Sequence, residues 1–132
     1  MLLLLSLLPM SFAANVFVID DSDPDSEGLI NRLVLSGHSV ERSSDYGFYE
    51  WNFEAYLYDL SETDVVIWLD GNAAAPLSMP ESGQEALLAY VESGGGLLSF
   101  GQNGTNFLNF KHPILGELLP LRSWTTWTNA TY

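Results

Sequence analysis

The sequence predicts an α/β fold: a small three-layer, flavodoxin-like sandwich with a mostly parallel sheet of four to five strands. Two observations carry this prediction. Short apolar runs without polar alternation, at residues 16–19 and 64–70, are typical of strands that are buried on both faces. The segments between such runs place their apolar residues at helical spacing, and strands that alternate with helices imply right-handed crossovers and parallel pairing.

Each element has its own signature in the chain. Residues 29–34 place apolar side chains at helical spacing, and Gly37 follows as a helix stop. Residues 80–91 repeat this pattern before the run Gly94–Gly96. Residues 45–60 are rich in aromatics, and the part from 51 to 60 fits either a helix or an irregular segment. The expected strands are residues 15–20, 38–42, 64–70, 97–100 and 123–128, and a short helix is expected within 112–119.

Composition narrows the function classes. The chain has 132 residues, of which 47% are hydrophobic, so it can bury the core of one domain. Its 17 acidic and 4 basic residues leave a formal charge of −13, which argues against nucleic-acid binding and disfavours anionic membranes. The absence of cysteine excludes disulfides, thiolate zinc sites and a cysteine nucleophile.

Residues 1–14 resemble a secretory signal peptide. They form an apolar run that ends in the small-residue pattern Ser11-Phe12-Ala13, which is typical of a cleavage site. The run is too short for a spanning helix, which needs about 20 apolar residues. The sequence therefore predicts a single domain at residues 15–132 that is secreted, periplasmic or at the cell surface, with no stable membrane span after cleavage. A buried first strand or helix is the alternative.

Polar side chains follow the predicted strands at their carboxyl ends, where ligands bind in such sheets. Asp20, Asp21 and Asp70 could converge there on a divalent cation, Ca²⁺ or Mg²⁺, because hard cations prefer carboxylate oxygens. The same acids resemble those of a receiver-like switch, although the lysine expected in the last strand has no counterpart. Alternatively, the acids are solvated and cap a helix N-terminus. No other cofactor is expected.

Two further kinds of site are candidates at this edge. Ser99 follows an apolar strand and precedes a glycine-containing turn, which is where a nucleophile would stand. Of the two histidines, His38 begins a strand at the wrong end, which leaves His112 as the general base. The polar loop residues that could form a binding rim are Gly71, Asn72, Gln102 and Asn103.

Three segments, residues 16–21, 63–71 and 84–102, resemble the class I glutamine amidotransferase-like superfamily, in the non-catalytic form found in secreted bacterial proteins. The helix that is followed by three glycines and a strand is the most specific of them. The resemblance implies that Ser99 occupies the position of the catalytic cysteine, and the later His-x-Glu pair has no match. It also implies a minimal or C-terminally truncated domain, because the family's domain is commonly longer.

Together these observations predict a non-catalytic exported module with a binding or accessory role. Its partners would be an unknown ligand or other domains of a larger exported protein. The alternatives are a hydrolase-like enzyme that uses Ser99 and a receiver-like switch that binds a divalent cation.

Overall fold

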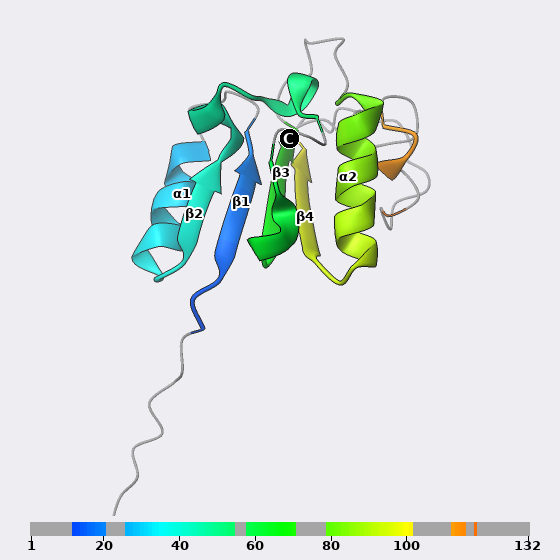
Figure 1. Ribbon diagram of the computed structural model, residues 1–132. Helices are drawn as coiled ribbons and strands as arrows, with labels where there is room; N and C mark the ends of the chain where they lie inside the picture. Colours follow the sequence, from blue (N-terminus) through cyan, green and yellow to red (C-terminus); the bar gives the residue numbers. More distant parts are fainter. Residues whose placement is uncertain are drawn as a thin grey trace, which may run out of the picture.

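Four strands form one parallel sheet in the order β2-β1-β3-β4 (Figure 1). The computed structural model describes residues 12–20, 26–54, 58–70, 79–101, 112–115 and 118. The strands are β1 (Asn15–Ile19), β2 (Ser39–Arg42), β3 (Val65–Asp70) and β4 (Gly96–Gly101). The helices are α1 (Ser26–Leu35) and α2 (Glu81–Glu92). Neither of them is long and apolar enough to cross a membrane.

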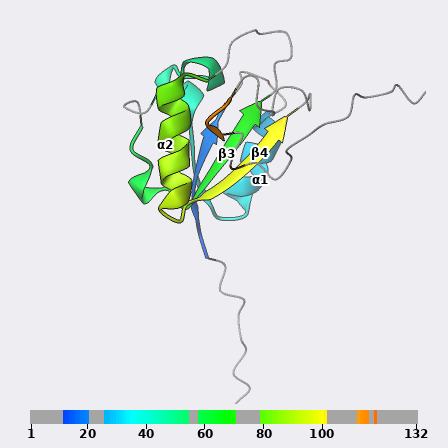
Figure 2. The same cartoon turned by 90° about the vertical axis from the view of Figure 1, so that its right-hand side faces the viewer.

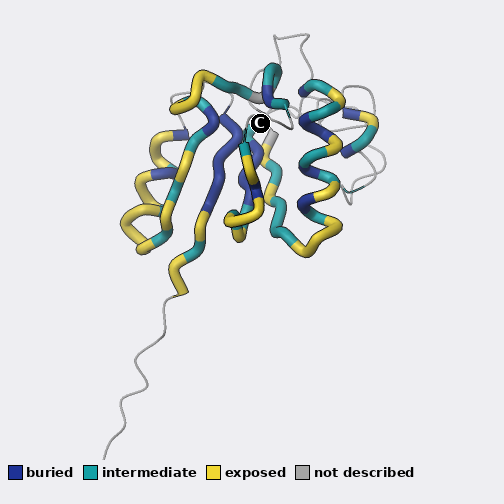
Figure 3. Tube along the Cα trace, in the orientation of Figure 1, coloured by how far each residue is buried: buried dark blue, intermediate teal, exposed yellow. Residues whose placement is uncertain are grey.

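The two helices cover opposite faces of the sheet, which gives the three layers that the sequence predicts (Figure 2). Side chains of a strand alternate between the faces. Val16 and Val18 of β1 therefore pack with Ile30 of α1, whereas Phe17 and Ile19 join the core that contains residues of α2. Because β1 has a strand on either side and a layer on each face, these four side chains are at most 5% exposed (Figure 3).

The aromatic-rich stretch forms three short 3-10 turns rather than one helix: η1 (Ser43–Tyr46), η2 (Glu50–Asn52) and η3 (Leu60–Glu62). Its side chains pack on the face of the sheet that α2 also covers. The ring of Tyr58 stacks on Phe17 with centroids 3.9 Å apart, and Phe53 is buried beside it. This connection is therefore held to the sheet by the packing of its aromatic rings. Their spacing in the sequence shows no helical period.

Two of the three glycines after α2 are required for different structural reasons. Gly94 has a φ of 105°, a left-handed conformation that ends the helix and that other residues rarely adopt. A Cβ on Gly95 would lie 2.2 Å from the ring of Tyr90, so only glycine allows this close approach. The hydroxyl of Tyr90 then donates to the carbonyl of Thr63 at 3.2 Å, which joins α2 to the start of β3.

The strand β4 differs from β1 in its burial. Leu97 packs against the core on the α2 face, but Leu98 and Phe100 on the other face are about half exposed. Among the described residues, α1 covers β1 and β3 on that face and leaves these two side chains open. The predicted strand at 123–128 lies outside the described residues.

Candidate functional site

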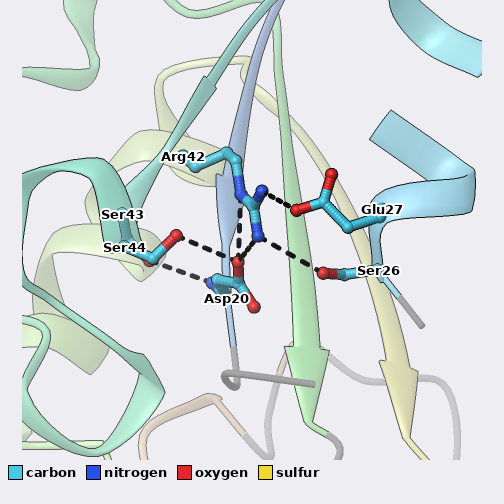
Figure 4. A network of polar contacts seen from close by, with 6 residues as sticks. All are labelled: Asp20, Ser26, Glu27, Arg42, Ser43 and Ser44. Atoms are coloured by element: carbon cyan, nitrogen blue, oxygen red, sulfur yellow. Dashed lines mark hydrogen bonds and ion pairs between the residues drawn. The ribbon is translucent and has the colours of Figure 1, made fainter. Parts of the chain in front are cut away.

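The carboxyl ends of β1 and β2 carry a partly buried ion pair between Asp20 and Arg42 (Figure 4). Asp20 directly follows β1 and is fully buried, and Arg42 is the last residue of β2. Because the two strands are parallel neighbours, their ends meet at the same edge. Arg42 donates from Nε to Oδ2 of Asp20 at 3.1 Å and also from Nη2 to the same oxygen. We call this group the Asp20–Arg42 clasp.

Hydroxyl and carboxylate groups complete the clasp. Ser44 donates to Oδ2 of Asp20 at 3.0 Å, and the backbone N–H of Asp20 donates to Oγ of Ser43 at 2.9 Å. On the other side, Nη1 of Arg42 pairs with Glu27, in the first turn of α1. The clasp therefore joins the end of β1, the end of β2 with the following turn, and the start of α1.

The charges in the clasp favour a fixed structural contact. Burial opposes the charge on Arg42, but its hydrogen bonds with Asp20 and Glu27 outweigh this and raise the pKa of Arg42 above its usual value. Arg42 thus stays cationic across the physiological range. Its pairing with a fully buried carboxylate satisfies a charge that would otherwise be costly to bury.

The predicted metal ligands are only partly described. Oδ2 of Asp20 is engaged by Arg42 and Ser44, so this oxygen binds within the chain. Asp21 and the side chain of Asp70 lie outside the described residues. In the part of the chain that is described, no three His, Cys, Asp or Glu side chains gather in a way that could hold a metal ion. The Ca²⁺ or Mg²⁺ site stays a prediction.

Ser99 and His112 both lie toward the α2 face of the sheet. Ser99 pairs in register with Trp68, and the alternation along β4 gives it the same direction as Leu97. His112 is fully buried and packs edge-on against Trp68, with ring centroids 4.7 Å apart. Its Nε2 accepts a hydrogen bond from the backbone N–H of Met79 at 3.1 Å.

This contact gives His112 a structural role at the start of α2. Gln84, also buried, donates to the carbonyl of Met79 at 2.8 Å and accepts from the N–H of Ile114 at 3.2 Å. The segment that contains His112 and Ile114 is thereby attached to the first turns of α2. Since Nε2 of His112 is used by Met79, that nitrogen is not open to take a proton from Ser99. Catalysis by these two residues stays a prediction.

The four predicted rim residues Gly71, Asn72, Gln102 and Asn103 lie outside the described residues. His38 does lie at the amino end of the sheet, as its position before β2 indicates, and its Nδ1 accepts from the N–H of Ala14 at 3.2 Å.

A groove that the sequence does not predict lies at the amino end of the sheet, between α2 and the turn that contains η3. We call it the α2 groove, and its volume is about 720 Å³. Two aromatic rings, two carboxylates and a row of small residues are among its lining, and none of the lining residues that the structure describes is basic. The main lining residues are Tyr58, Asp59, Thr63, Asp64, Ala86, Ala89, Tyr90 and the turn 93–95.

Each carboxylate of the α2 groove uses one oxygen within the chain. Oδ1 of Asp59 accepts from the N–H of Ser61 at 2.9 Å, and this backbone bond lowers the pKa of Asp59. Oδ2 of Asp64 accepts from the N–H of Asn15 at 2.8 Å. The backbone thus orients both side chains.

A weak signal in the sequence marks this groove. Ala86, Ala89 and Ser93 are spaced three and four residues apart, so they share one face of α2 and leave room beside it. Large apolar side chains at those positions would have closed the space. The pattern does not reveal that the turn at Asp59 and Asp64 lies opposite, because that is decided by tertiary packing.

The fold and the two sites define a small parallel α/β domain with a partly buried ion pair at one end of its sheet and an open acidic groove at the other. Comparison with known proteins finds no matching family model, no matching curated protein and no matching solved structure. The resemblance to the glutamine amidotransferase-like superfamily therefore stays a prediction.

Proposed function

We propose that the chain is a non-catalytic binding module of an exported protein and that it holds its ligand in the α2 groove. The observation that carries the proposal is the groove itself. Its volume of about 720 Å³ lies in the range of ligand sites, about 300–1,000 Å³. It combines two aromatic rings with oriented carboxylates and hydroxyls, which are groups that bind and orient a ligand.

The binding role, rather than catalysis, is supported by the chemistry of the described groups. The chain has no cysteine, and the groove contains no histidine that could activate Ser61 or Ser93. At the other end, the buried carboxylate of Asp20 is engaged by Arg42, and Nε2 of His112 by Met79. These groups support the fold there.

A titration followed by NMR tests the binding role. We would add phenol, n-butylammonium chloride or N-acetylglucosamine, at millimolar concentration, to the isotope-labelled full chain. The proposal expects at least one probe to shift the backbone amides of Ser61, Asp64 and Gly94. The variant Ala89→Trp fills the groove from an exposed position and should abolish these shifts, whereas Asn31→Trp, at an exposed position of α1, should not.

The outcomes of this titration are distinct. Shifts confined to the amides of Asp20, Ser43 and Ser44 would assign binding to the carboxyl end of the sheet and contradict the groove. An absence of shifts with all three probes would contradict the binding role itself.

Export is the second part of the proposal, and the apolar leader at residues 1–14 supports it. Expression of the full chain in a bacterium, followed by N-terminal sequencing of the exported fraction, tests it. Cleavage at the end of this leader should leave Ala14 or Asn15 as the first residue, directly at the start of β1. Retention of the intact chain inside the cell would contradict export.

A further inference from the structure

We infer that the amino terminus created by leader cleavage binds to His38 and Asp64, so that the processed chain is more stable than the chain that still carries its leader. This inference rests on the export part of the proposed function. It comes from the hydrogen bonds that the backbone nitrogens of Ala14 and Asn15 make, and from the position of the cleavage site directly before β1.

The packed part of the chain begins where the leader is expected to end. Phe12 is 79% exposed and Ala13 is exposed as well. Ala14 is half-buried, packs against the core on the α1 face, and accepts through its carbonyl from the N–H of Ser39 at 3.0 Å. Among the described residues, cleavage after Ala13 would therefore remove only exposed ones and leave the four strands in place.

The nitrogen of Ala14 faces the imidazole of His38. Its N–H donates to Nδ1 of His38 at 3.2 Å, a contact made by the neutral ring that carries its proton on Nε2. After cleavage the same nitrogen becomes an α-ammonium group, which still donates and also carries a charge. Because a charge-assisted hydrogen bond is roughly twice as strong as one between neutral groups, the contact should strengthen when the leader leaves.

Asp64 supplies the opposite charge. Its Oδ2 accepts from the N–H of Asn15 at 2.8 Å, one residue along the chain from the new terminus. One residue of extended backbone spans about 3.5 Å, so the ammonium group of Ala14 would lie within about 6 Å of this carboxylate. Opposite charges at this separation attract each other. If cleavage occurs one position later, the ammonium group of Asn15 is itself the donor to Asp64.

Backbone hydrogen bonds fix both acceptors in place. His38 directly follows the end of α1, and its N–H donates to the carbonyl of Leu33 at 3.1 Å, as in a helix C-terminal cap. The N–H of Asp64 donates to the carbonyl of Asn15 at 2.9 Å, and its carbonyl accepts from the N–H of Gly96 at 3.1 Å. Because both loops are already ordered, little conformational entropy is lost when the terminus binds.

Other charged groups also lie at this end of the sheet. Glu41 and Glu62 line a small cavity beside Asn15, and Arg32 lies in the last turn of α1. These groups are the same before and after cleavage. A comparison of chains that differ only at their first residue therefore isolates the effect of the ammonium group.

Two chains that differ by one residue test the inference. We would release chains that begin at Ala14 and at Ala13 from a fusion protein, with a protease that leaves no extra residue, and compare their urea unfolding at about pH 7. In the longer chain the ammonium group lies one residue away, and the nitrogen of Ala14 is an amide again. The folding equilibrium constant of the shorter chain should be about threefold larger. The difference should disappear at about pH 10, where α-amino groups are neutral.

The amino group itself gives a second readout, which does not depend on unfolding. A pH titration followed by the ¹³C signal of the first alanine methyl measures the pKa of each terminus. The pKa of the α-amino group should be higher at Ala14 than at Ala13 of the longer chain, because the carboxylate and the imidazole favour the charged amine.

Variants made in both chains identify the groups that act. Asp64→Asn keeps an acceptor for the N–H of Asn15 and should remove most of the difference between the chains, and His38→Ala should reduce it. The control Glu81→Gln removes a carboxylate from an exposed position at the other end of the sheet and should leave the difference unchanged. In the full chain, whose amino group belongs to Met1, Asp64→Asn removes no such partner.

The failures of export and of this inference are distinguishable. Retention of the intact chain inside the cell contradicts export. Equal unfolding of the two released chains, or equal pKa values of their α-amino groups, would overturn the inference alone. So would a difference that persists in both Asp64→Asn and His38→Ala, because the terminus would then be held elsewhere. In the exported fraction, a first residue of Ala14 or Asn15 supports the inference, and any other first residue overturns it.

Discussion

Acidic side chains are paired with an arginine at one end of the sheet and exposed to solvent at the other. At the carboxyl end, Asp20 and Glu27 share the guanidinium of Arg42, and Asp20 is fully buried in the clasp. At the amino end, Asp59 and Asp64 are exposed, and no basic residue is found among the described residues that line their groove. The chain has only four basic residues; one of them, Arg42, is partly buried in the first region, and none of the described ones lies in the second.

This difference separates charges that maintain the fold from charges that are open to a ligand. A buried carboxylate requires a partner, since an unpaired charge away from water is costly. An exposed carboxylate has no such requirement, because water solvates it. Substitutions at the carboxyl end should therefore change stability, and substitutions at the amino end should change binding.

The largest effect is expected from Arg42→Met. The variant keeps an aliphatic stem but removes the guanidinium that pairs with the buried carboxylate of Asp20, so the free energy of unfolding should fall by about 3 kcal/mol. Urea unfolding followed by tryptophan fluorescence measures this, since Trp68 is fully buried. Urea is preferable to an ionic denaturant, which would screen the charges.

Two further variants show whether the burial of charge is the cause. Glu27→Gln removes the exposed partner of Arg42 and should cost less than about 1 kcal/mol. The double variant Asp20→Asn with Arg42→Met has no buried charge left and should be more stable than Arg42→Met alone. Equal stability of Arg42→Met and Glu27→Gln would contradict the structural role of the clasp.

The sequence predicts the sheet better than it predicts either site. Residues 16–19 and 65–69 are apolar without alternation because β1 and β3 are central strands with a layer on each face, so burial alone marks them. The exact pairing of Asp20 with Arg42 depends on which strands become neighbours, and these residues are 22 positions apart. No local sequence pattern predicts that contact.

The same limit applies to the aromatic connection and the groove. Tyr58 stacks on Phe17, 41 positions before it, so its place is decided by the finished sheet and not by a helical period. The sequence also predicts the glycine run as a helix stop, which is confirmed at Gly94. The contact of Gly95 with Tyr90 cannot be predicted from the sequence, because it depends on the folded structure.

A moderate effect is expected from Gly95→Ala at the amino end. The new Cβ would lie 2.2 Å from the ring of Tyr90, so the ring must move, at a cost of about 1–3 kcal/mol. Gly28→Ala is the control, because it lies in α1 with open space around it and should stabilise the chain by up to about 1 kcal/mol. Equal effects of the two variants in urea unfolding would contradict the close packing of Tyr90.

A smaller effect is expected at alkaline pH from the tyrosines that face Glu41. Burial and the hydrogen bond to Glu41 raise the pKa of Tyr58 to about 12, from 10.0. The folded chain thus keeps this proton after the unfolded chain has lost it. The resulting stability is complete below the unfolded pKa and is lost as pH rises from about 10 to about 12.

Urea unfolding at about pH 9 and about pH 11 measures this loss. Tyr58→Phe should reduce the loss without abolishing it, because the pKa of Tyr46 is raised as well, chiefly by its own hydrogen bond to Glu41. An identical loss in the variant and the original chain would exclude Tyr58 as the source.

The smallest effect on stability is expected from Asp59→Asn with Asp64→Asn. Each asparagine can still accept from the backbone N–H of Ser61 or Asn15, and no cation in the described residues loses a partner. The free energy of unfolding should change by less than about 1 kcal/mol, and it should rise at low salt because repulsion among exposed acids decreases. Urea unfolding at low salt and in about 0.5 M NaCl measures both expectations. A loss as large as that of Arg42→Met would mean that these carboxylates maintain the fold, and the contrast between the two ends of the sheet would then be wrong.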